Sequence, residues 1–199
     1  MPRRTKLICA AIALIAQCAC GLTHDRLTFS VKVSDFRRQS NSLIKNRQPD
    51  DTVEIALPGK LLNPATPVKL IPRAQADWST TEHSAASIVS ANTAGDIPWM
   101  VENYVPSDRP AFVKQLTDRS AAERVRAYYR NLGKISITGW TEIRGFTVLF
   151  LQGLDEDGDA TLISIALSKT PSGWKQTDAL QNDDTFELVW TALHTGGAH

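Results

Sequence analysis

Cysteine is nearly absent from this chain, and its few positions are informative. The three cysteines are Cys9, Cys18 and Cys20, so no disulfide can cross-link the chain beyond Cys20. Long apolar runs are scarce too, because no run after Cys20 approaches the roughly 20 residues that a membrane-spanning helix needs. We expect the folded part to be held together by its hydrophobic core, and any membrane attachment to come from the N-terminus.

Strong net charge is also lacking. The chain has 22 Lys and Arg residues against 21 Asp and Glu residues, which gives a formal net charge of +1. Removal of an N-terminal segment containing Arg3, Arg4 and Lys6 would take away three positive charges and leave about −2. A protein this close to neutrality does not attract nucleic acid by bulk charge. We expect no nucleic-acid partner.

The sequence contains none of the common cofactor or catalytic motifs. It has no P-loop, no dinucleotide fingerprint and no Gly-x-Ser-x-Gly elbow. The acidic run 155–159 has its glycine in the wrong place for an EF-hand, and a solvated hairpin turn explains it better. The histidines are scattered without the spacing of zinc ligands: His24, His83, His194 and His199. We therefore expect no cofactor and no metal site.

The N-terminus has the pattern of a secretory signal. Arg3, Arg4 and Lys6 precede an apolar run over residues 7–16, and small residues follow it. About ten apolar residues are too few to cross a bilayer core, whereas they suit the apolar region of a signal peptide. The pattern predicts a signal peptide over residues 1–20 and an exported protein, located in the periplasm or anchored to a membrane of a bacterial envelope.

Two kinds of processing remain open at the end of this segment. Cys18 follows the apolar run as in a bacterial lipobox, where the thiol is acylated, but Gln17 stands where the pattern prefers a small residue. Cys20 has Ala19 before it and places Gln17 three residues ahead. Ordinary cleavage after Cys18, Cys20 or Gly21 is the alternative to lipidation at Cys18 or Cys20.

Residues 22–78 form a strand-rich segment punctuated by proline. Apolar and polar residues alternate over 27–34 and over 53–57, which is the period of a strand with one solvated face. A third short run, 68–70, lies between Pro67 and Pro72. The polar stretch 37–51 predicts an exposed loop.

Residues 79–133 have the period of helices. Capping boxes at 79–82 and 120–123 predict two helix starts, and Asp96 and Asp108 fit the starts of two shorter helices. Gly133 predicts the end of the last one, where a left-handed conformation is needed. From residue 134 the period returns to two, which predicts an antiparallel meander with short turns.

A closing helix is predicted over 184–194. Phe186, Val189, Trp190 and Leu193 follow at i, i+3, i+4 and i+7, so we expect this face to be buried on the sheet. Thr191 lies outside that face and should tolerate a charge.

Helices followed by an antiparallel sheet that ends in Gly173-Trp174-Lys175 resemble the NTF2-like (cystatin-like, cone-shaped α+β) superfamily. The stretches ANTAGDIPWMVENY, 91–104, and LISIALSKTPSGWKQT, 162–177, are similar to its first-helix break and its terminal hairpin. The resemblance covers roughly residues 79–181 and implies helices packed on a curved sheet that surrounds a cavity. Members of this superfamily include enzymes, small-molecule binders and accessory domains, so the fold does not choose among them.

If such a cavity were catalytic, tyrosine and carboxylate side chains would be the natural acid-base groups. The weak candidates are His83, Asp96, Tyr104 and Tyr128, with Tyr129 beside them. Each has a simpler structural role, such as helix capping or packing at the core edge. We expect a non-catalytic binding or accessory domain of 79–199, whose partner is a protein, a second copy or a small ligand. A periplasmic enzyme and a structural component of an envelope complex are the alternatives.

Overall fold

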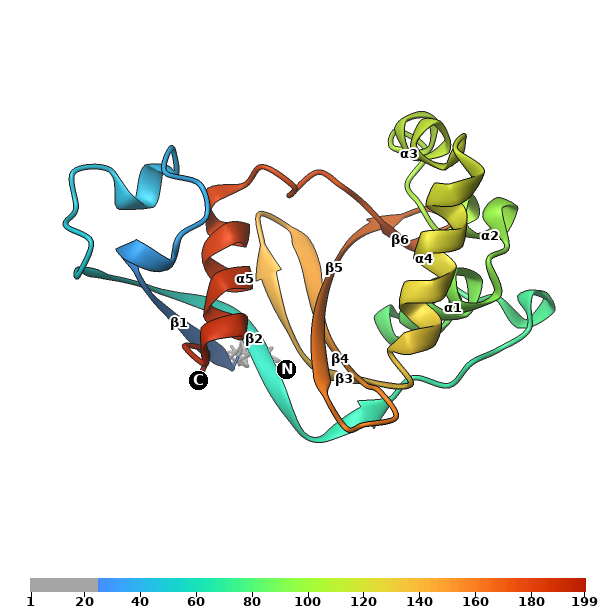
Figure 1. The fold of residues 1–199 in the computed structure, drawn as a ribbon, viewed down its shortest axis with the longest axis horizontal. Coiled ribbons are helices and arrows are strands. Elements are labelled where there is room, and N and C mark those ends of the chain that lie inside the picture. Colours follow the sequence, from blue (N-terminus) through green and yellow to red (C-terminus); the bar gives the residue numbers. More distant parts are fainter. Residues whose placement is uncertain (1–24) are drawn as a thin grey trace, which may run out of the picture.

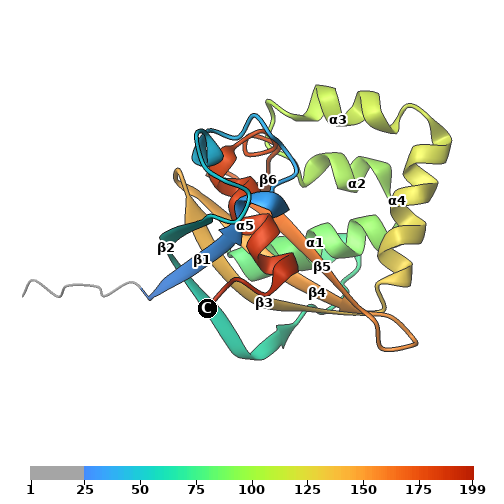
Figure 2. The same cartoon turned by 60° about the vertical axis from the view of Figure 1, so that its left-hand side comes forward.

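The computed structural model describes residues 25–199, so the expected signal segment 1–20 lies outside the described residues. The six strands form one antiparallel sheet in the order β1-β2-β3-β4-β5-β6. Figures 1 and 2 show that the sheet is curved, with α5 at the β1 end and the other α-helices gathered at the β6 end. The predicted α+β class, with helices packed on a curved antiparallel sheet, is confirmed.

The N-terminal strands belong to the same sheet as the meander. β1 (Arg26–Lys32) pairs with the first half of β2 (Thr52–Pro67), and the second half of β2 pairs with β3 (Lys134–Ile143). β2 continues without interruption through Pro58 and Gly59. At Gly59 the neighbouring strand is so close that a Cβ would collide with the carbonyl oxygen of Trp140. The strand expected at 68–70 is absent, because Val68 donates one backbone hydrogen bond to Ile135 and the chain then leaves the sheet.

The loop 37–51 is less exposed than expected. It contains the short 3₁₀ helix η2 (Ser42–Ile44), follows another, η1 (Val33–Asp35), and buries Asn41 and Ile44. Asn41 Nδ2 and Arg38 Nε each donate to Glu187 Oε2 at 2.8 Å. These bonds hold the loop against α5 (Asp184–Thr195), because a buried carboxylate needs such partners.

The meander is confirmed. It consists of β3, β4 (Phe146–Leu154), β5 (Ala160–Thr170) and β6 (Gly173–Gln176). The acidic run 155–159 is the β4–β5 hairpin turn, where Asp155 Oδ1 accepts hydrogen bonds from the amides of Asp157 and Asp159. Within residues 25–199, no cluster of three or more His, Cys, Asp or Glu side chains could hold a metal ion.

Four helices lie between β2 and β3, after the 3₁₀ helix η3 (Arg73–Gln75): α1 (Thr81–Ala94), α2 (Ile97–Glu102), α3 (Arg109–Leu116) and α4 (Arg119–Asn131). Asp96 caps α2 as expected, accepting from the Trp99 amide at 3.0 Å. Both predicted capping boxes are shifted, since Thr80 caps α1 and Asp118 caps α4. Gly133 adopts the expected positive φ immediately after Leu132, the C-cap of α4.

The expected buried face of α5 is confirmed for Val189, and Phe186 and Leu193 pack partly buried against the same apolar cluster, but the expectation is wrong for Trp190 and Thr191. Its fully buried apolar residues are Leu188, Val189 and Ala192, whereas Trp190 is only half-buried. Thr191 is 3% exposed, so the position expected to tolerate charge lies inside the protein. The Trp190 ring instead contacts the guanidinium of Arg37 and the ring of His194, which lie 3.6 Å and 3.8 Å from its centre.

The two faces of the sheet carry separate apolar clusters. α5 packs with β1 and with the outer face of β4, around Phe29 and Phe150. α1 packs on the opposite face, around Ile88 and Leu149, and a third cluster fills the space among α1 to α4. Among the described residues, no helix is both long enough and apolar enough to cross a membrane.

Candidate functional site

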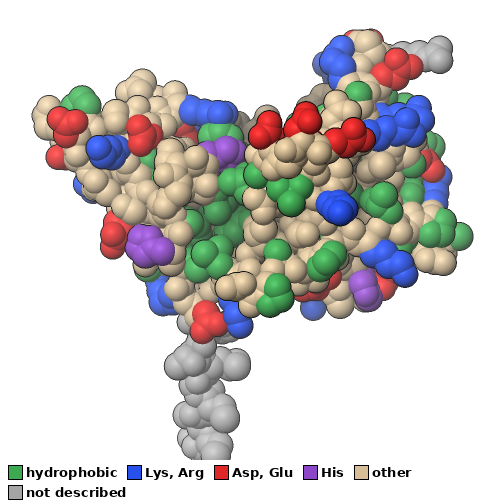
Figure 3. All heavy atoms as spheres, turned by 60° about the horizontal axis from the view of Figure 1, so that its bottom comes forward, with side chains coloured by type: hydrophobic (Ala, Val, Ile, Leu, Met, Phe, Trp, Pro, Cys, Tyr) green, Lys and Arg blue, Asp and Glu red, His purple; other side chains and the backbone are tan. Residues whose placement is uncertain are grey.

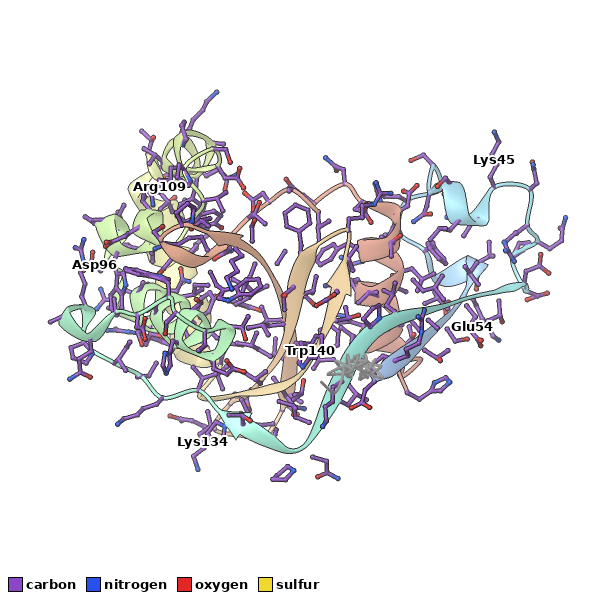
Figure 4. All side chains as sticks on the ribbon, turned by 180° about the vertical axis from the view of Figure 1, so that it is seen from behind. Lys45, Glu54, Asp96, Arg109, Lys134 and Trp140 are labelled. Carbon is purple, nitrogen blue, oxygen red and sulfur yellow. The ribbon has the colours of Figure 1, made fainter. Side chains whose placement is uncertain are left out.

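The four candidate acid-base residues do not meet in one site. Asp96 lies on the outer side of the helices (Figure 4), where it caps α2 and pairs with Arg73 at 3.4 Å. His83 is exposed in the first turn of α1, with Nδ1 2.6 Å from Asp77 Oδ2. Tyr128 is 47% exposed on α4. Only Tyr104, which is 7% exposed, lines an internal space.

That internal space is a small cavity of about 170 Å³ among the helices and β6, lined by both polar and apolar side chains. The Tyr104 hydroxyl accepts from Gln176 Nε2 at 2.8 Å, and Asn103 Oδ1 accepts from Trp78 Nε1 at 2.8 Å. Burial raises the pKa of Tyr104 well above its usual range, so its phenol stays protonated at neutral pH. No carboxylate and no histidine is among the residues lining this cavity. The arrangement can donate and accept hydrogen bonds, but it holds no pair of groups suited to proton transfer.

A larger groove lies between the helices and the start of β3. Its volume is about 470 Å³, within the range of roughly 300–1,000 Å³ typical of small-ligand sites. Four segments supply its walls: the stretch 67–70, α1, α4 and β3. The apolar residues among its lining are Pro67, Val68, Leu70, Val89, Tyr129 and Ile135.

The charged residues of this groove all have one sign. Arg130 and Lys134 line it, and no carboxylate does. Arg130 Nε donates to the Thr93 carbonyl at 3.2 Å, and its terminal nitrogens form no hydrogen bond or ion pair with a described residue, so they can bind an anion. Lys134 makes no side-chain hydrogen bond or ion pair with the residues that the structure describes, and Figure 4 shows it far from Asp96. The carboxylates of 155–157 line an adjoining hollow on the other side of Arg130.

Tyr129 separates the groove from the inner cavity, since its side chain lines both. It comes from α4 and packs against the cluster formed by α1 and the sheet. Burial raises the pKa of Tyr129 to about 12, so the phenol between the groove and the inner cavity is uncharged over the whole physiological pH range. An apolar body that enters the groove therefore meets an uncharged aromatic wall.

Lys175 is a buried cation outside both spaces. Its side chain is 2% exposed, its Nζ donates to the Glu102 carbonyl at 3.1 Å, and the ammonium lies 3.1 Å from the centre of the Trp78 ring. Burial lowers its pKa to about 8. Because the folded pKa lies below the unfolded value of 10.5, burial of the charged form costs stability below pH 8, and this cost disappears as the pH rises to 10.5.

Lys175→Met tests this assignment through pH dependence. Between pH 8 and pH 10.5, we expect the wild-type protein to gain stability relative to the variant, by on the order of 2–3 kcal/mol. Urea unfolding of both proteins across this window measures the difference, in which the other titrating groups cancel. A difference that does not change with pH would contradict the lowered pKa.

Comparison with known proteins adds little to this picture. No family model and no curated protein matches the chain. Among solved structures, a candidate NTF2-like transpeptidase from Campylobacter jejuni has 15% identity and a TM-score of 0.38, covering 49% of this chain and 97% of its own.

A SEC-C motif containing protein from Rhodopseudomonas palustris has 16% identity and a TM-score of 0.35, covering 49% of this chain and 75% of its own. A candidate calcium/calmodulin dependent protein kinase II association domain from Xanthomonas campestris has 11% identity and a TM-score of 0.27, covering 51% of this chain and 90% of its own. Likeness at this level says nothing about activity.

Proposed function

We propose that this protein is an exported, non-catalytic binding module of NTF2-like type, which holds a small amphipathic anion in the groove between α1, α4 and β3. The observation that carries the proposal is an apolar groove of about 470 Å³ whose charged lining residues are two cations. The apolar walls favour a ligand with a hydrocarbon chain, and Arg130 and Lys134 favour an anionic group on that ligand.

The fit of such a ligand follows from the groove's composition. The stretch 67–70, Val89 and Ile135 would bury apolar surface, which contributes about 25 cal/mol for each Å² removed from water. Arg130 can add charge-assisted hydrogen bonds to a carboxylate or phosphate, which are about twice as strong as neutral ones. A neutral ligand of the same shape gains only the first contribution.

Decanoate is the test ligand, with decanol as its neutral counterpart. We expect isothermal titration calorimetry to show decanoate binding more tightly than decanol, and Arg130→Gln with Lys134→Gln to weaken decanoate by roughly tenfold or more. Decanol binding should be unchanged in this double variant. Lys114→Gln is the control, because Lys114 is an exposed cation on α3 away from the groove. Equal affinities for decanoate and decanol in the wild-type protein would contradict the proposal.

The two other functions left open by the sequence have less support. An enzyme needs convergent titratable groups, whereas the candidates that reach a cavity are two tyrosines, Tyr104 and Tyr129, with no carboxylate or histidine among the lining residues. An assembly component would need a continuous exposed apolar patch. The large exposed apolar side chains of the described residues come from different elements and connections: Leu61, Leu70, Ile97, Val113, Tyr128 and Leu154.

Export is part of the proposal and has its own test. We expect mass spectrometry of the protein from an expressing bacterium to show loss of the N-terminus up to Cys18, Cys20 or Gly21. Added acyl mass on Cys18 or Cys20 would identify a lipoprotein, and its absence ordinary cleavage. Either cut leaves β1 intact, since β1 begins at Arg26. Recovery of the protein with an intact Met1 would contradict export.

A further inference from the structure

The outer edges of the sheet are mostly covered by other parts of the chain. At one end, the C-terminal residues pair with β1: Thr28 donates to the His199 carbonyl at 2.8 Å, and Ser30 donates to the Gly197 carbonyl at 2.8 Å. At the other end, β6 pairs with the segments before α1 and after α2. Trp174 donates to Trp78 at 2.7 Å, and Gln176 donates to Asn103 at 2.8 Å. Covered edges prevent unwanted strand pairing.

The first half of β5, at the β6 end of the sheet, has an edge that no described segment of the chain covers. β6 pairs only with residues 167–170 of β5, and Thr177 adds one bond to the Ala166 carbonyl at 3.0 Å. Residues alternate in direction along a strand, so Leu162 and Ser164 turn their backbone groups to the same side as Ala166, away from β4. No described residue hydrogen-bonds to these groups of Leu162 and Ser164.

A hollow follows this free edge. It has a volume of about 190 Å³ and is lined by Ser164, Gln181 and Phe186 among others. The segment after β6 departs from β5 at Thr177, which leaves room beside the edge. An added strand would lie in line with β6, with its outward side chains near the hollow.

Carboxylates stand at both ends of the free edge. The hairpin turn before β5 carries four of them, and none forms an ion pair with a described residue: Asp155, Glu156, Asp157 and Asp159. Figure 2 shows this hairpin projecting from the body of the molecule, and Figure 3, which looks onto that end, shows acidic side chains gathered there. Asp178 lines the hollow at the opposite end. The edge therefore attracts a basic strand.

The same charges disfavour a second copy of this chain. Two β5 strands paired antiparallel along their free halves would bring the acidic turn of each copy toward Asp178 of the other. Like charges placed across an interface cost binding energy. We propose that the free edge of β5, at Leu162 and Ser164, pairs with an extended basic segment of a partner protein, as in strand addition to an open sheet.

The probes are two synthetic peptides, acetyl-Lys-Val-Thr-Val-Thr-Val-Lys-amide and the same peptide with glutamate in place of lysine. We expect calorimetry to show the lysine peptide binding at least tenfold more tightly than the glutamate peptide. Binding of the lysine peptide should also slow hydrogen exchange of the Leu162 and Ser164 amides at least tenfold, because they become hydrogen-bonded. Equal binding of both peptides, or no protection of these amides, would overturn the proposal.

Two variants separate the backbone and the charge contributions. Ser164→Pro removes a backbone N–H that faces away from β4, whereas the hydrogen bonds between β5 and β4 are made by the residues on either side of Ser164. We therefore expect the variant to fold and to lose peptide binding. Glu156→Gln with Asp157→Asn leaves the fold untouched and should weaken the lysine peptide severalfold. Asp50→Asn with Glu54→Gln is the matched control, because it removes two exposed charges far from β5 along the sheet.

The oligomeric state completes the test. A monomer in analytical ultracentrifugation is expected. A dimer that Ser164→Pro converts to monomer would show that a second copy occupies the edge, and the proposal of a basic partner would then be wrong. The hollow beside the free edge and the groove share no lining residue.

Discussion

Thr191→Asp is expected to unfold the protein or to reduce its free energy of unfolding by about 4 kcal/mol or more, because the new carboxylate would be buried and unpaired. Thr191 is 3% exposed on α5, and its hydroxyl already lacks a hydrogen-bond partner. Urea unfolding followed by circular dichroism measures the loss.

Two neighbouring changes serve as controls for this prediction. Thr191→Val keeps the shape and removes the unpaired hydroxyl, so it should stabilise the protein by about 1 kcal/mol. Trp190→Ala should cost less than Thr191→Asp, because Trp190 lies on the half-buried side, against Arg37 and His194. If Trp190→Ala is the more damaging change and Thr191→Asp is silent, the described orientation of α5 is wrong.

Gly133→Val is the second change expected to have a large effect. Gly133 has φ 61° between α4 and β3, and a Cβ there would collide with the carbonyl oxygen of Leu154. We expect a loss of about 4 kcal/mol, which combines the left-handed backbone of a β-branched residue with overpacking against a rigid strand. Because Gly133 also lines the groove, decanoate binding should fall in any folded fraction.

Gly158→Val is the matched control. Gly158 also has a positive φ, of 86°, but nothing lies within 4 Å of a Cβ built on it. Only the backbone cost remains, so we expect a loss of about 1 kcal/mol. Thermal unfolding of both variants separates conformational strain from collision, and equal losses would contradict the close approach of β4 to Gly133.

The sequence predicted most elements because their signals are local. The alternation in β1, the cap at Asp96 and the short turns of the meander depend on neighbouring residues alone. The orientation of α5 depends on contacts that are distant in the chain. Choosing the face with the largest aromatic side chains selects Trp190, whereas the sheet accepts the smaller Ala192 and Thr191. Arg37 covers Trp190 from a loop that no helical pattern can reveal.

The course of β2 shows a second limit. Pro58 and Gly59 are local signals for a turn, yet each half of the strand has its own partner, β1 or β3. Ladder pairing on both sides outweighs the local preference. Val68, expected in a strand, instead forms a wall of the groove.

The candidate site was only partly predictable for the same reason. Tyr104 was a candidate because tyrosine side chains can serve as acid-base groups in a cavity of the fold that the sequence resembles. The groove is assembled from four segments between Pro67 and Ser136, and no local pattern in the sequence brings these segments together. The one local indication of the groove was the apolar run 68–70, which lies between two prolines and is too short for an independent strand.

The most direct test of the central claim is a nuclear magnetic resonance titration of the protein with decanoate. We expect the shifted methyl and amide signals to cluster at Val68, Val89 and Ile135, with a smaller effect at Tyr129. Signals of the hollow beside Trp190, which is lined by Arg37 and Phe186, should not move. Shifts confined to that hollow, or no saturable shifts at all, would contradict the account.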